Sequence, residues 1–382
     1  MKIAQVTGFF RPQKYGSNEL FLCKELSRMG HEVTIFTASE LREEYAMLNE
    51  NYVGKSTEFY EGFLIKRLPA RLKIRDIQIM PELLLSLLDE KFDIIHAHEF
   101  FSPSAFYSSL TKMVRQTPLV ITQHSDKPPL PLTSRYLYYA TACTVGQFSL
   151  KQANRIIALT RASRCHLLHF GVQDSKIEII PTPTDTNKFV PTSQNLLRDR
   201  WNLTSPIILY VGRFSEIKGI KYLLRAFPMV LKAVPEAKLV LVGGGPLETE
   251  VKALQRKYQN SVFWLPFVPN DIMPNIYVGS DVVVLPSLGE TFGNVTIEAM
   301  ACGKPVVGSC VGGMLDTIVD GVTGLHVQPG DSDQIANSLI KILKNDALRK
   351  ELGQNARKRA LTDFSYSVII KRVEKLYLDS LI

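Results

Sequence analysis

The run Ile207-Ile208-Leu209-Tyr210-Val211-Gly212-Arg213 consists of five apolar residues followed by a glycine and a cation. Such a run, without polar alternation, is typical of a strand buried on both faces of a parallel sheet. Two later runs have the same form, because Leu239–Val242 ends at Gly243 and Val282–Leu285 ends at Pro286. Amphipathic segments separate these runs, so this half of the chain predicts a doubly wound α/β sheet.

The N-terminal half repeats the alternation, beginning with the apolar run Ile3–Phe9. A segment with apolar residues at helical spacing follows it and closes at Gly30, and His31–Phe36 reads as the next strand. Further strand-like runs lie at Phe92–Ala97, Leu119–Thr122 and Arg155–Leu159. A second parallel sheet of the same kind is therefore expected.

The length of 382 residues predicts two domains, since a domain usually has about 150 residues. The junction is expected in the Pro/Thr/Asn-rich stretch 181–194, giving an N-terminal domain at 1–187 and a second domain at 188–365. The last helix, about 366–382, is expected to pack back on the first domain. Ligands of open α/β sheets bind at the carboxyl ends of the strands. Two such edges facing each other across a deep cleft would suit a large charged small molecule.

Composition narrows the classes of partner. Forty-five Lys+Arg against 37 Asp+Glu give a net charge of +8, without the long basic tracts of many nucleic-acid binders. Anionic small molecules or an anionic membrane surface fit this balance at least as well as nucleic acid does. The five cysteines include no C-x-x-C pair, and no run reaches the ~18 apolar residues of a spanning helix. With no signal peptide recognisable, a cytoplasmic location is expected.

The strongest functional signal is the segment Leu288–Val307. It reads as a strand end, a glycine-bearing loop and a helix that begins near Asn294, whose free N–H groups and dipole would bind an anion. Glu290 and Glu298 flank this helix start, which suits a ligand with both hydroxyls and phosphates. The alternative is that Glu298 is a buried helix carboxylate and Glu290 a cap.

A second signal is the segment Gly212–Gly219. Arg213 follows a strand end and Lys218 is expected to open the next helix, so two cations meet on one loop. They would suit a diphosphate, with Arg as a fork and Lys as a point charge. The alternative is a pair of solvated surface cations.

These motifs resemble those of a known enzyme family. Glu290 and Glu298 form the E-x7-E pattern of retaining glycosyltransferases with the GT-B fold, in a context similar to glycosyltransferase family 4, the glycosyl transferases group 1. The G-R-x4-K-G run at 212–219 matches that family's diphosphate-binding segment. Gly16 lies in the equivalent of its glycine-rich first loop, and 93–98 matches its D-x-x-H-x-H strand.

The resemblance implies transfer of a sugar from a nucleotide diphosphate sugar to a glycan or lipid-linked acceptor, with retention and with no metal or other cofactor. It implies that Glu298 holds the ribose hydroxyls and that Glu290 lies by the donor sugar. Arg213 and Lys218 would stabilise the departing diphosphate. His124 matches a histidine near the reacting centre, the alternative being a satisfied loop histidine. The implied donor-binding set is Gly16, Arg213, Lys218, Gly243, Glu290, Phe292, Gly293, Asn294, Val295 and Glu298.

Two departures from the family pattern concern the acceptor side. The first loop has a single glycine in Tyr15–Glu19, and Pro181–Asp185 replaces the usual P-N-G-x-D. Two other functions remain open: a sugar-nucleotide epimerase or hydrolase on the same fold, and a non-catalytic sugar-nucleotide-binding protein. Base contacts are expected from backbone groups in loops such as Trp264–Val268.

Two sequence features that could suggest a metal site or a dinucleotide cofactor have simpler interpretations. Asp331-Ser332-Asp333 is expected to cap a helix rather than bind a metal. No G-x-G-x-x-G follows the first strand, which argues against a dinucleotide cofactor.

The segment 64–88 is a candidate for peripheral contact with an anionic membrane. Its cations Lys66, Arg67, Arg71, Lys73 and Arg75 precede an apolar run that could form an amphipathic helix. The alternative is that the leucines at 83–88 simply cover the sheet.

Overall fold

The computed structural model describes residues 1–10, 18–39, 56–74, 77–124, 132–192, 197–198 and 204–381. The chain forms two compact units: unit 1 comprises Met1–Pro181 and Ile369–Ile382, and unit 2 comprises Thr182–Val368. The expected domain borders, at 187 and 365, stand beside observed borders at 181 and 368. Gly16 lies outside the described residues.

Among the described residues of unit 1, eight strands form one sheet in the order β10-β9-β8-β7-β1-β2-β4-β3. The strand pairs are parallel except β3–β4, which is antiparallel and lies at the edge. The strands are β1 (Lys2–Val6), β2 (Glu32–Ala38), β3 (Ser56–Tyr60), β4 (Phe63–Leu68), β7 (Ile94–His98), β8 (Leu119–Gln123), β9 (Arg155–Ala158) and β10 (Ile177–Ile179). A separate antiparallel pair joins β5 (Leu72–Ile74) and β6 (Ile77–Ile79).

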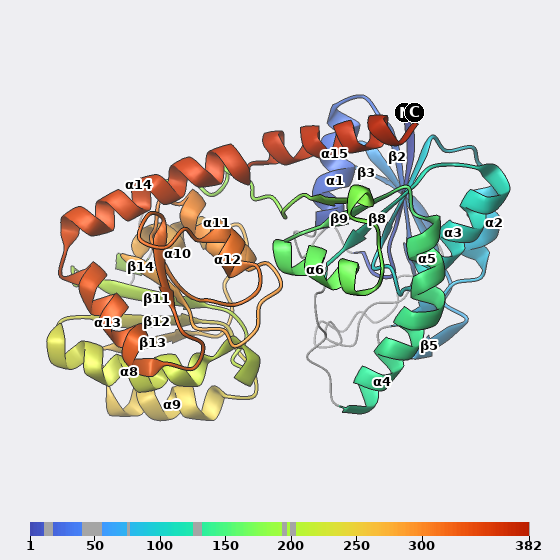
Figure 1. The fold of residues 1–382 in the computed structure, drawn as a ribbon. Helices are drawn as coiled ribbons and strands as arrows, with labels where there is room; N and C mark the ends of the chain where they lie inside the picture. Colours follow the sequence, from blue (N-terminus) through green and yellow to red (C-terminus); the bar gives the residue numbers. More distant parts are fainter. Residues whose placement is uncertain are drawn as a thin grey trace. The chain divides into compact units, whose positions relative to one another are not determined.

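The helices of unit 1 cover both faces of this sheet. In Figure 1, α2, α3 and α5 lie on one face, and α1 lies with the red C-terminal helix α15 on the other. The helices are α1 (Asn18–Arg28), α2 (Glu82–Asp89), α3 (Pro103–Arg115), α4 (Leu132–Thr141), α5 (Gln147–Gln152), α6 (Arg161–His169) and α15 (Tyr366–Leu381). A π-helical segment, Ala142–Gly146, joins α4 to α5, and a 3-10 turn lies at Asp174–Lys176.

Unit 2 contains a parallel sheet of six described strands in the order β13-β12-β11-β14-β15-β16. The strands are β11 (Ile207–Val211), β12 (Lys238–Val242), β13 (Val262–Leu265), β14 (Val282–Leu285), β15 (Val306–Ser309) and β16 (Gly324–Val327). Counted within the unit, this order is 3-2-1-4-5-6, that of a doubly wound nucleotide-binding sheet. The prediction of an α/β fold with two doubly wound parallel sheets is confirmed.

The helices of unit 2 also lie on both faces of their sheet (Figure 1). They are α8 (Ile220–Ala233), α9 (Glu248–Lys257), α10 (Met273–Gly279), α11 (Asn294–Ala301), α12 (Met314–Thr317), α13 (Ser332–Leu343) and α14 (Asp346–Asp363). Residues of α8 and α13 form a buried core with alternate residues of β11 and β12. Lys218 does not open α8 as expected, because it ends a separate 3-10 turn, Glu216–Lys218.

Each sheet has one point at which the strand order reverses. In unit 1 this switch point lies between β1 and β7, and in unit 2 between β11 and β14. Loops on either side of such a point diverge to opposite faces, which leaves room for a ligand at the carboxyl ends of the two strands. The fold therefore places the candidate site of each unit at its own switch point.

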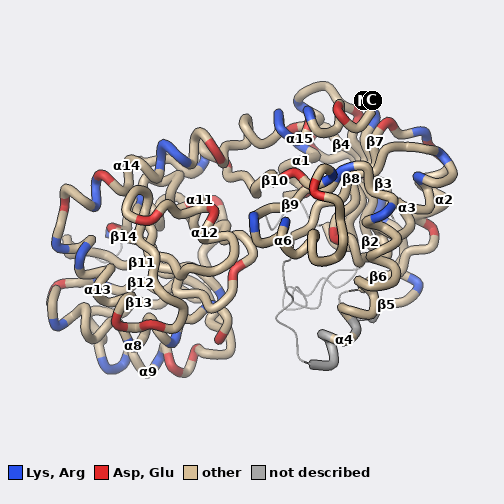
Figure 2. Tube along the Cα trace, viewed as in Figure 1, with Lys and Arg blue, Asp and Glu red and all other residues tan. Residues whose placement is uncertain are grey.

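Charge is distributed without long single-sign tracts in the described segments. Figure 2 shows basic and acidic positions interspersed along the outer helices of unit 2, for example on α14. Within the described part of the chain, no helix combines the length and apolar character that a membrane-spanning segment requires.

Candidate functional site

At the switch point of unit 2, the loops that follow neighbouring strands are joined by backbone hydrogen bonds. The Leu288 N–H, after β14, donates to the Ile217 carbonyl, after β11, at 2.8 Å. The Phe214 N–H donates to the Gly244 carbonyl, after β12, also at 2.8 Å. These bonds fix the loops on which the predicted donor-binding residues lie.

The two charged residues Lys218 and Glu290 meet at this edge. The Lys218 Nζ lies 2.7 Å from the Glu290 Oε2, and the Glu290 side chain is only 13% exposed. The ion pair joins the loop after β11 to the loop after β14, directly across the switch point. The sequence predicted both residues for the site but not their direct contact.

Two adjacent glycines after β15, Gly312 and Gly313, pack against the backbone of Glu290. The Gly313 N–H donates to the Glu290 carbonyl at 3.1 Å. Gly312 has φ +47°, and a Cβ at this position would lie 1.7 Å from the same carbonyl oxygen. Only glycine fits here, because a side chain would overlap the backbone that carries Glu290.

Arg213 lies two residues beyond the end of β11 and is exposed. Its carbonyl accepts a hydrogen bond of 2.9 Å from the hydroxyl of Tyr210, a residue buried in the core. This bond anchors the backbone of the loop, so the guanidinium extends from a fixed position beside the switch point.

Helix α11 begins where the sequence predicted, at Asn294. Its N-cap is Gly293, with φ +86°, and Phe292 before it is buried against Phe364. In an α-helix the first N–H groups have no partner within the helix, and the dipole is positive at this end. Asn294 is exposed and Val295 partly so. The start of α11 can therefore bind an anion.

Glu298 lies one turn into α11, where its Oε2 accepts a hydrogen bond of 2.7 Å from the Tyr277 hydroxyl of α10. Burial raises the pKa of Glu298 to about 7, although this hydrogen bond and the charge of Lys188 act in the opposite direction. Burial also raises the pKa of Tyr277 well above its usual value, so the phenol remains the donor. Glu298 thus changes charge near neutral pH while one of its oxygens is held in place.

Gly243 lies after β12 with both backbone groups engaged. Its N–H donates to the Leu265 carbonyl at 2.9 Å, and its carbonyl accepts from the Trp264 indole at 2.8 Å. The tryptophan therefore ties the end of β13 to the loop after β12, in the region from which base contacts are expected.

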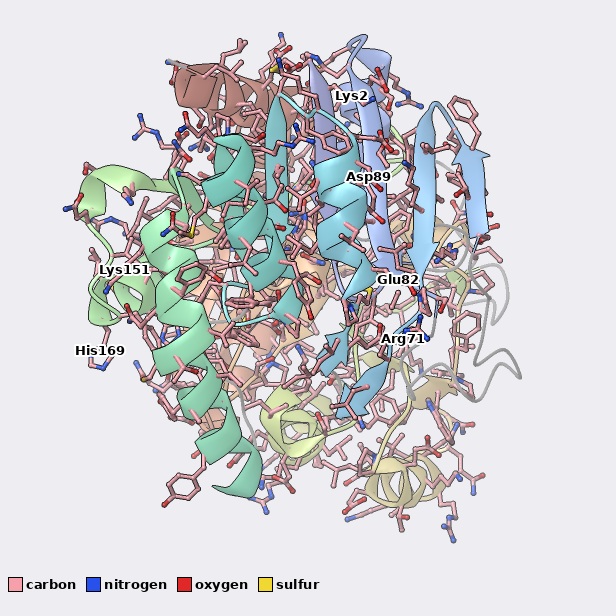
Figure 3. The ribbon with its side chains drawn as sticks, turned by 90° about the vertical axis from the view of Figure 1, so that its right-hand side faces the viewer. Lys2, Arg71, Glu82, Asp89, Lys151 and His169 are labelled. Atoms are coloured by element: carbon pink, nitrogen blue, oxygen red, sulfur yellow. The ribbon has the colours of Figure 1, made fainter. Side chains whose placement is uncertain are left out.

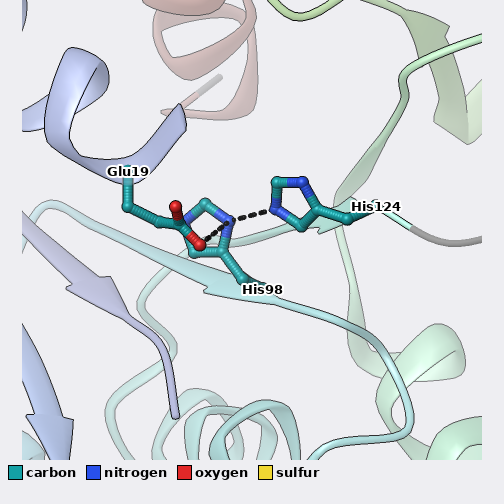
Figure 4. Close-up of side chains that lie close together, drawn as sticks. All are labelled: Glu19, His98 and His124. Atoms are coloured by element: carbon teal, nitrogen blue, oxygen red, sulfur yellow. Dashed lines mark hydrogen bonds and ion pairs between the residues drawn. The ribbon is translucent and has the colours of Figure 1, made fainter. Parts of the chain in front are cut away.

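In unit 1, His124 follows β8 and contacts the end of β7. The His98 Nδ1 lies 2.8 Å from the His124 Nε2, with the rings nearly parallel, and 4.0 Å from the Glu19 carboxylate of α1 (Figure 4). Burial lowers the pKa of His98 to about 4; the Glu19 charge acts in the opposite direction, and the charge of His124 lowers it further. His98 is therefore neutral at physiological pH.

Glu19, His98 and His124 also have the residue types of a metal site. One ligand atom from each lies within 4.8 Å of the others. Two nitrogen ligands of a tetrahedral zinc would, however, lie ~3.3 Å apart, given Zn–N bonds of ~2.05 Å. The observed 2.8 Å between the His98 and His124 nitrogens is the distance of a hydrogen bond.

The structure gathers Arg213, Lys218, Glu290 and the start of α11 around the switch point of unit 2, whereas His124 belongs to unit 1. Sequence reasoning missed Tyr277 as the partner of Glu298 and Gly312 as the support of Glu290. The tyrosine left no local signal, because it comes from another helix. For the support of Glu290, the sequence did carry a signal, namely the pair Gly312-Gly313 after an apolar run.

Two other predictions concern residues outside the switch points. The Asp331 carboxylate accepts from the Gln334 N–H at 2.9 Å at the start of α13, so its prediction as a helix cap is confirmed. In the basic segment, Lys66 pairs with Glu90, Arg67 with Glu58 and Arg71 with Glu82, the last pair being visible in Figure 3. Among the described residues of the segment 64–88, those from Glu82 onward are helical, in α2, and Leu83 and Leu87 of this helix are buried.

Comparison with protein families matches both halves of the chain. The family described as "Glycosyl transferases group 1" matches residues 195–359, and "Glycosyltransferase Family 4" matches residues 20–188. An uncharacterized glycosyltransferase of Methanocaldococcus jannaschii is 28% identical over 99% of this chain and 98% of its own length. A D-inositol 3-phosphate glycosyltransferase of Xylanimonas cellulosilytica is 30% identical over 70% of this chain and 67% of its own length.

Solved structures share the fold. A sucrose-phosphate synthase from Thermosynechococcus elongatus superposes with a TM-score of 0.81 at 25% identity, covering 99% of this chain and 98% of that one. Anabaena HepE, solved in complex with UDP, gives a TM-score of 0.77 at 21% identity, covering 99% of this chain and all of that one.

Proposed function

Because the chain belongs to the glycosyl transferases group 1 and is a glycosyltransferase, we propose that it transfers a sugar from a nucleotide diphosphate sugar with retention and without a metal. The observation that carries this proposal is the convergence of Arg213, Lys218, Glu290 and the start of α11 at the unit 2 switch point. A ligand with a diphosphate, a ribose and a sugar matches these groups one by one.

The cationic groups would bind the diphosphate. Arg213 offers a planar fork of donors and Lys218 a compact charge, and the N–H groups from Phe292 to Val295 add a positive helix end. Charge on the diphosphate grows as the bond to the sugar breaks, so fixed cations stabilise the transition state more than the ground state.

The two glutamates would take different parts of the donor. Glu298 has Oε2 bonded to Tyr277, and its other oxygen would accept hydrogen bonds from the ribose hydroxyls. Glu290 would lie by the sugar, and its ion pair with Lys218 would then link the sugar site to the phosphate site. Glu290 therefore serves turnover more than binding.

The charges at the site support metal independence. Arg213 and Lys218 supply the positive charge that a divalent ion supplies elsewhere, and Asp331 is used as a helix cap. Activity unchanged in EDTA is expected; activity lost in EDTA and restored by Mg²⁺ or Mn²⁺ would overturn this part.

The acceptor proposed is a glycan or a lipid-linked acceptor. A lipid-linked acceptor would bring the enzyme to an anionic membrane surface through about residues 64–88. The UDP bound in HepE supports a nucleoside diphosphate donor, and the inositol phosphate named for the Xylanimonas relative adds small phosphorylated polyols to the acceptors worth assaying.

A thermal-shift screen with UDP-, GDP- and ADP-sugars identifies the donor, since a ligand of the native state raises the midpoint. Release of nucleoside diphosphate is then followed with and without acceptors. Release only with acceptor supports a transferase, release without acceptor indicates a hydrolase or epimerase, and binding without turnover indicates a non-catalytic protein. The anomeric configuration of the product tests retention.

Variants assign the residues. Glu298→Ala and Arg213→Ala are expected to weaken binding of the nucleoside diphosphate, whereas Glu290→Ala should spare binding and reduce turnover. Lys350→Ala, which removes an exposed cation from α14 of the same unit, is the matched control. Unchanged donor affinity in both Glu298→Ala and Arg213→Ala would remove the donor-site assignment.

A further inference from the structure

A path of hydrogen-bonded polar side chains crosses the buried interior of unit 1. It comprises Gln5 of β1, His96 and His98 of β7, Thr122 of β8 and Tyr377 of α15, all at most 3% exposed. Polar groups so deeply buried are costly unless each is hydrogen-bonded. The hydrogen bonds along this path determine which ring nitrogen of each histidine carries the proton.

The Gln5 amide sets the direction of hydrogen-bond donation along this path of side chains. Its Nε2 donates to the Tyr377 hydroxyl oxygen at 2.9 Å, and its Oε1 lies 3.1 Å from the His98 Nε2. An amide oxygen can only accept, so His98 carries its proton on Nε2 and leaves Nδ1 as an acceptor.

The 2.6 Å between the Tyr377 hydroxyl oxygen and the His96 Nδ1 is shorter than the usual N–H···O range, which favours the phenol as the donor of this bond and leaves its oxygen to accept from the amide. With its oxygen accepting from Gln5, the phenol donates its proton to the His96 Nδ1 at 2.6 Å, and the His96 Nε2 then donates to the Thr122 hydroxyl at 2.7 Å. Every proton on this path has an acceptor, so the path is satisfied in one consistent direction.

The direction extends to His124. Its Nε2 lies 2.8 Å from the His98 Nδ1, and since that atom has no proton, the His124 Nε2 must be the donor. His124 is then the tautomer with its proton on Nε2, and its Nδ1 is an acceptor. Among the described residues, the titratable groups facing this path are Glu19 and Cys23 of α1, His96 of β7 and Tyr377 of α15.

We propose that Tyr377 is a positioning residue which, through Gln5 and His98, holds His124 with Nδ1 as a hydrogen-bond acceptor for a hydroxyl of a sugar substrate. The substrate part of this inference rests on the proposed function; the tautomer part rests only on the contacts within unit 1. Tyr377 touches no reacting group itself, and it lies 253 positions along the chain from His124.

Nitrogen-15 NMR of the full chain with labelled histidine tests the tautomers directly. Single His→Gln variants assign the signals of His96, His98 and His124. We expect all three rings to carry the proton on Nε2 at neutral pH. A proton on the His124 Nδ1 would overturn the inference, and this measurement needs no variant of Tyr377.

The second measurement uses Tyr377→Phe, with Tyr107→Phe of α3 as the matched control in the same unit. Without the phenol, either orientation of the Gln5 amide is allowed, so His98 and His124 should become mixtures of tautomers. The ratio kcat/KM for transfer should fall by about 10-fold, the size of one neutral hydrogen bond. Nucleoside diphosphate affinity, which belongs to unit 2, should be unchanged.

The outcomes separate the two proposals. Tautomers that stay unmixed in a folded Tyr377→Phe protein would refute the positioning role of Tyr377. A protein that shows the expected tautomers but turns over no donor would leave the proton path standing and refute the proposed function.

Discussion

At the scale of single residues, the raised pKa of Glu298 leads us to predict that stability and nucleotide binding depend on pH. The pKa of its carboxyl is 4.5 in an unperturbed state and about 7 in the folded protein. Between these values the folded state binds a proton that the unfolded chain has released. Raising the pH from about 4.5 to 7 therefore lowers the free energy of unfolding contributed by this group.

We predict that this loss is absent in Glu298→Gln, which mimics the protonated form. Urea unfolding at pH 5 and pH 7.5 measures it, and equal pH dependence in both proteins would contradict it. Nucleoside diphosphate affinity of the wild-type protein should change in the opposite sense and rise with pH through about 7, because the carboxylate accepts ribose hydroxyls better than the acid does.

A second prediction at this scale concerns Gly312. Alanine here would require both a positive φ and a Cβ 1.7 Å from the Glu290 carbonyl oxygen. We expect Gly312→Ala to lose about 3 kcal/mol or more and to displace Glu290, abolishing turnover. Gly321→Ala is the control, because Gly321 has φ +71° with no atom within 4 Å of its Cβ position.

The control should lose only about 1–2 kcal/mol, the cost of the left-handed conformation alone. Chemical unfolding and donor turnover of both variants give the comparison. Equal losses in stability would show that the turn after β15 tolerates the extra atom.

At the scale of elements, the start of α13 tests the interpretation of Asp331-Ser332-Asp333. We predict that Asp331→Ala lowers the free energy of unfolding by about 1 kcal/mol and that Asp331→Asn retains most of it, since both Asp and Asn cap well. Asp333→Ala, at an exposed first-turn position, is the control. A thermal midpoint of the wild type that rises with Mg²⁺ and no longer does so in Asp331→Ala would favour a metal site instead.

The elements that could be predicted from the sequence are those with a local signal. The run Ile207–Val211 became β11 without change, because a short unbroken apolar run closed by a glycine is typical of a strand buried on both faces. The expected strand Ile3–Phe9 ends earlier, at Val6. The hairpin of β3 and β4 was missed, because β3 is largely exposed and has no apolar pattern.

The same limit applies to the candidate sites. Arg213, Lys218, Glu290 and Glu298 could be proposed because each lies in a short motif beside a strand end. Tyr377 was out of reach, since hydrophobic periodicity places it on a helix but does not say which distant strand it meets. Gln5 gave a weak signal, being a polar residue within the apolar strand β1.

At the scale of the whole molecule, membrane contact through about residues 64–88 stays a prediction. The cations Lys66, Arg67 and Arg71 each pair with a carboxylate, so these three described side chains leave little unbalanced positive charge for lipid headgroups. We expect weak sedimentation with anionic vesicles at low salt that disappears at about 1 M salt, where the Debye length is ~3 Å.

Neutral vesicles and the variant with charge reversal at all five basic positions of the segment are the controls. Donor binding should be intact in that variant. A protein that stays in the supernatant with anionic vesicles at low salt would refute membrane contact and favour a soluble acceptor.

Unit 1 is built from two separate stretches of the sequence, which affects how the protein folds during synthesis. A ribosome delivers residues 1–181 first, then the whole of unit 2, and only afterwards the segment 369–381 that completes unit 1. Unit 2 can therefore fold while unit 1 still lacks Tyr377, and during that interval the side chains of Gln5 and His96 await their partner. We therefore expect the protein to depend most on chaperones during synthesis, before the C-terminal segment of unit 1 has been made.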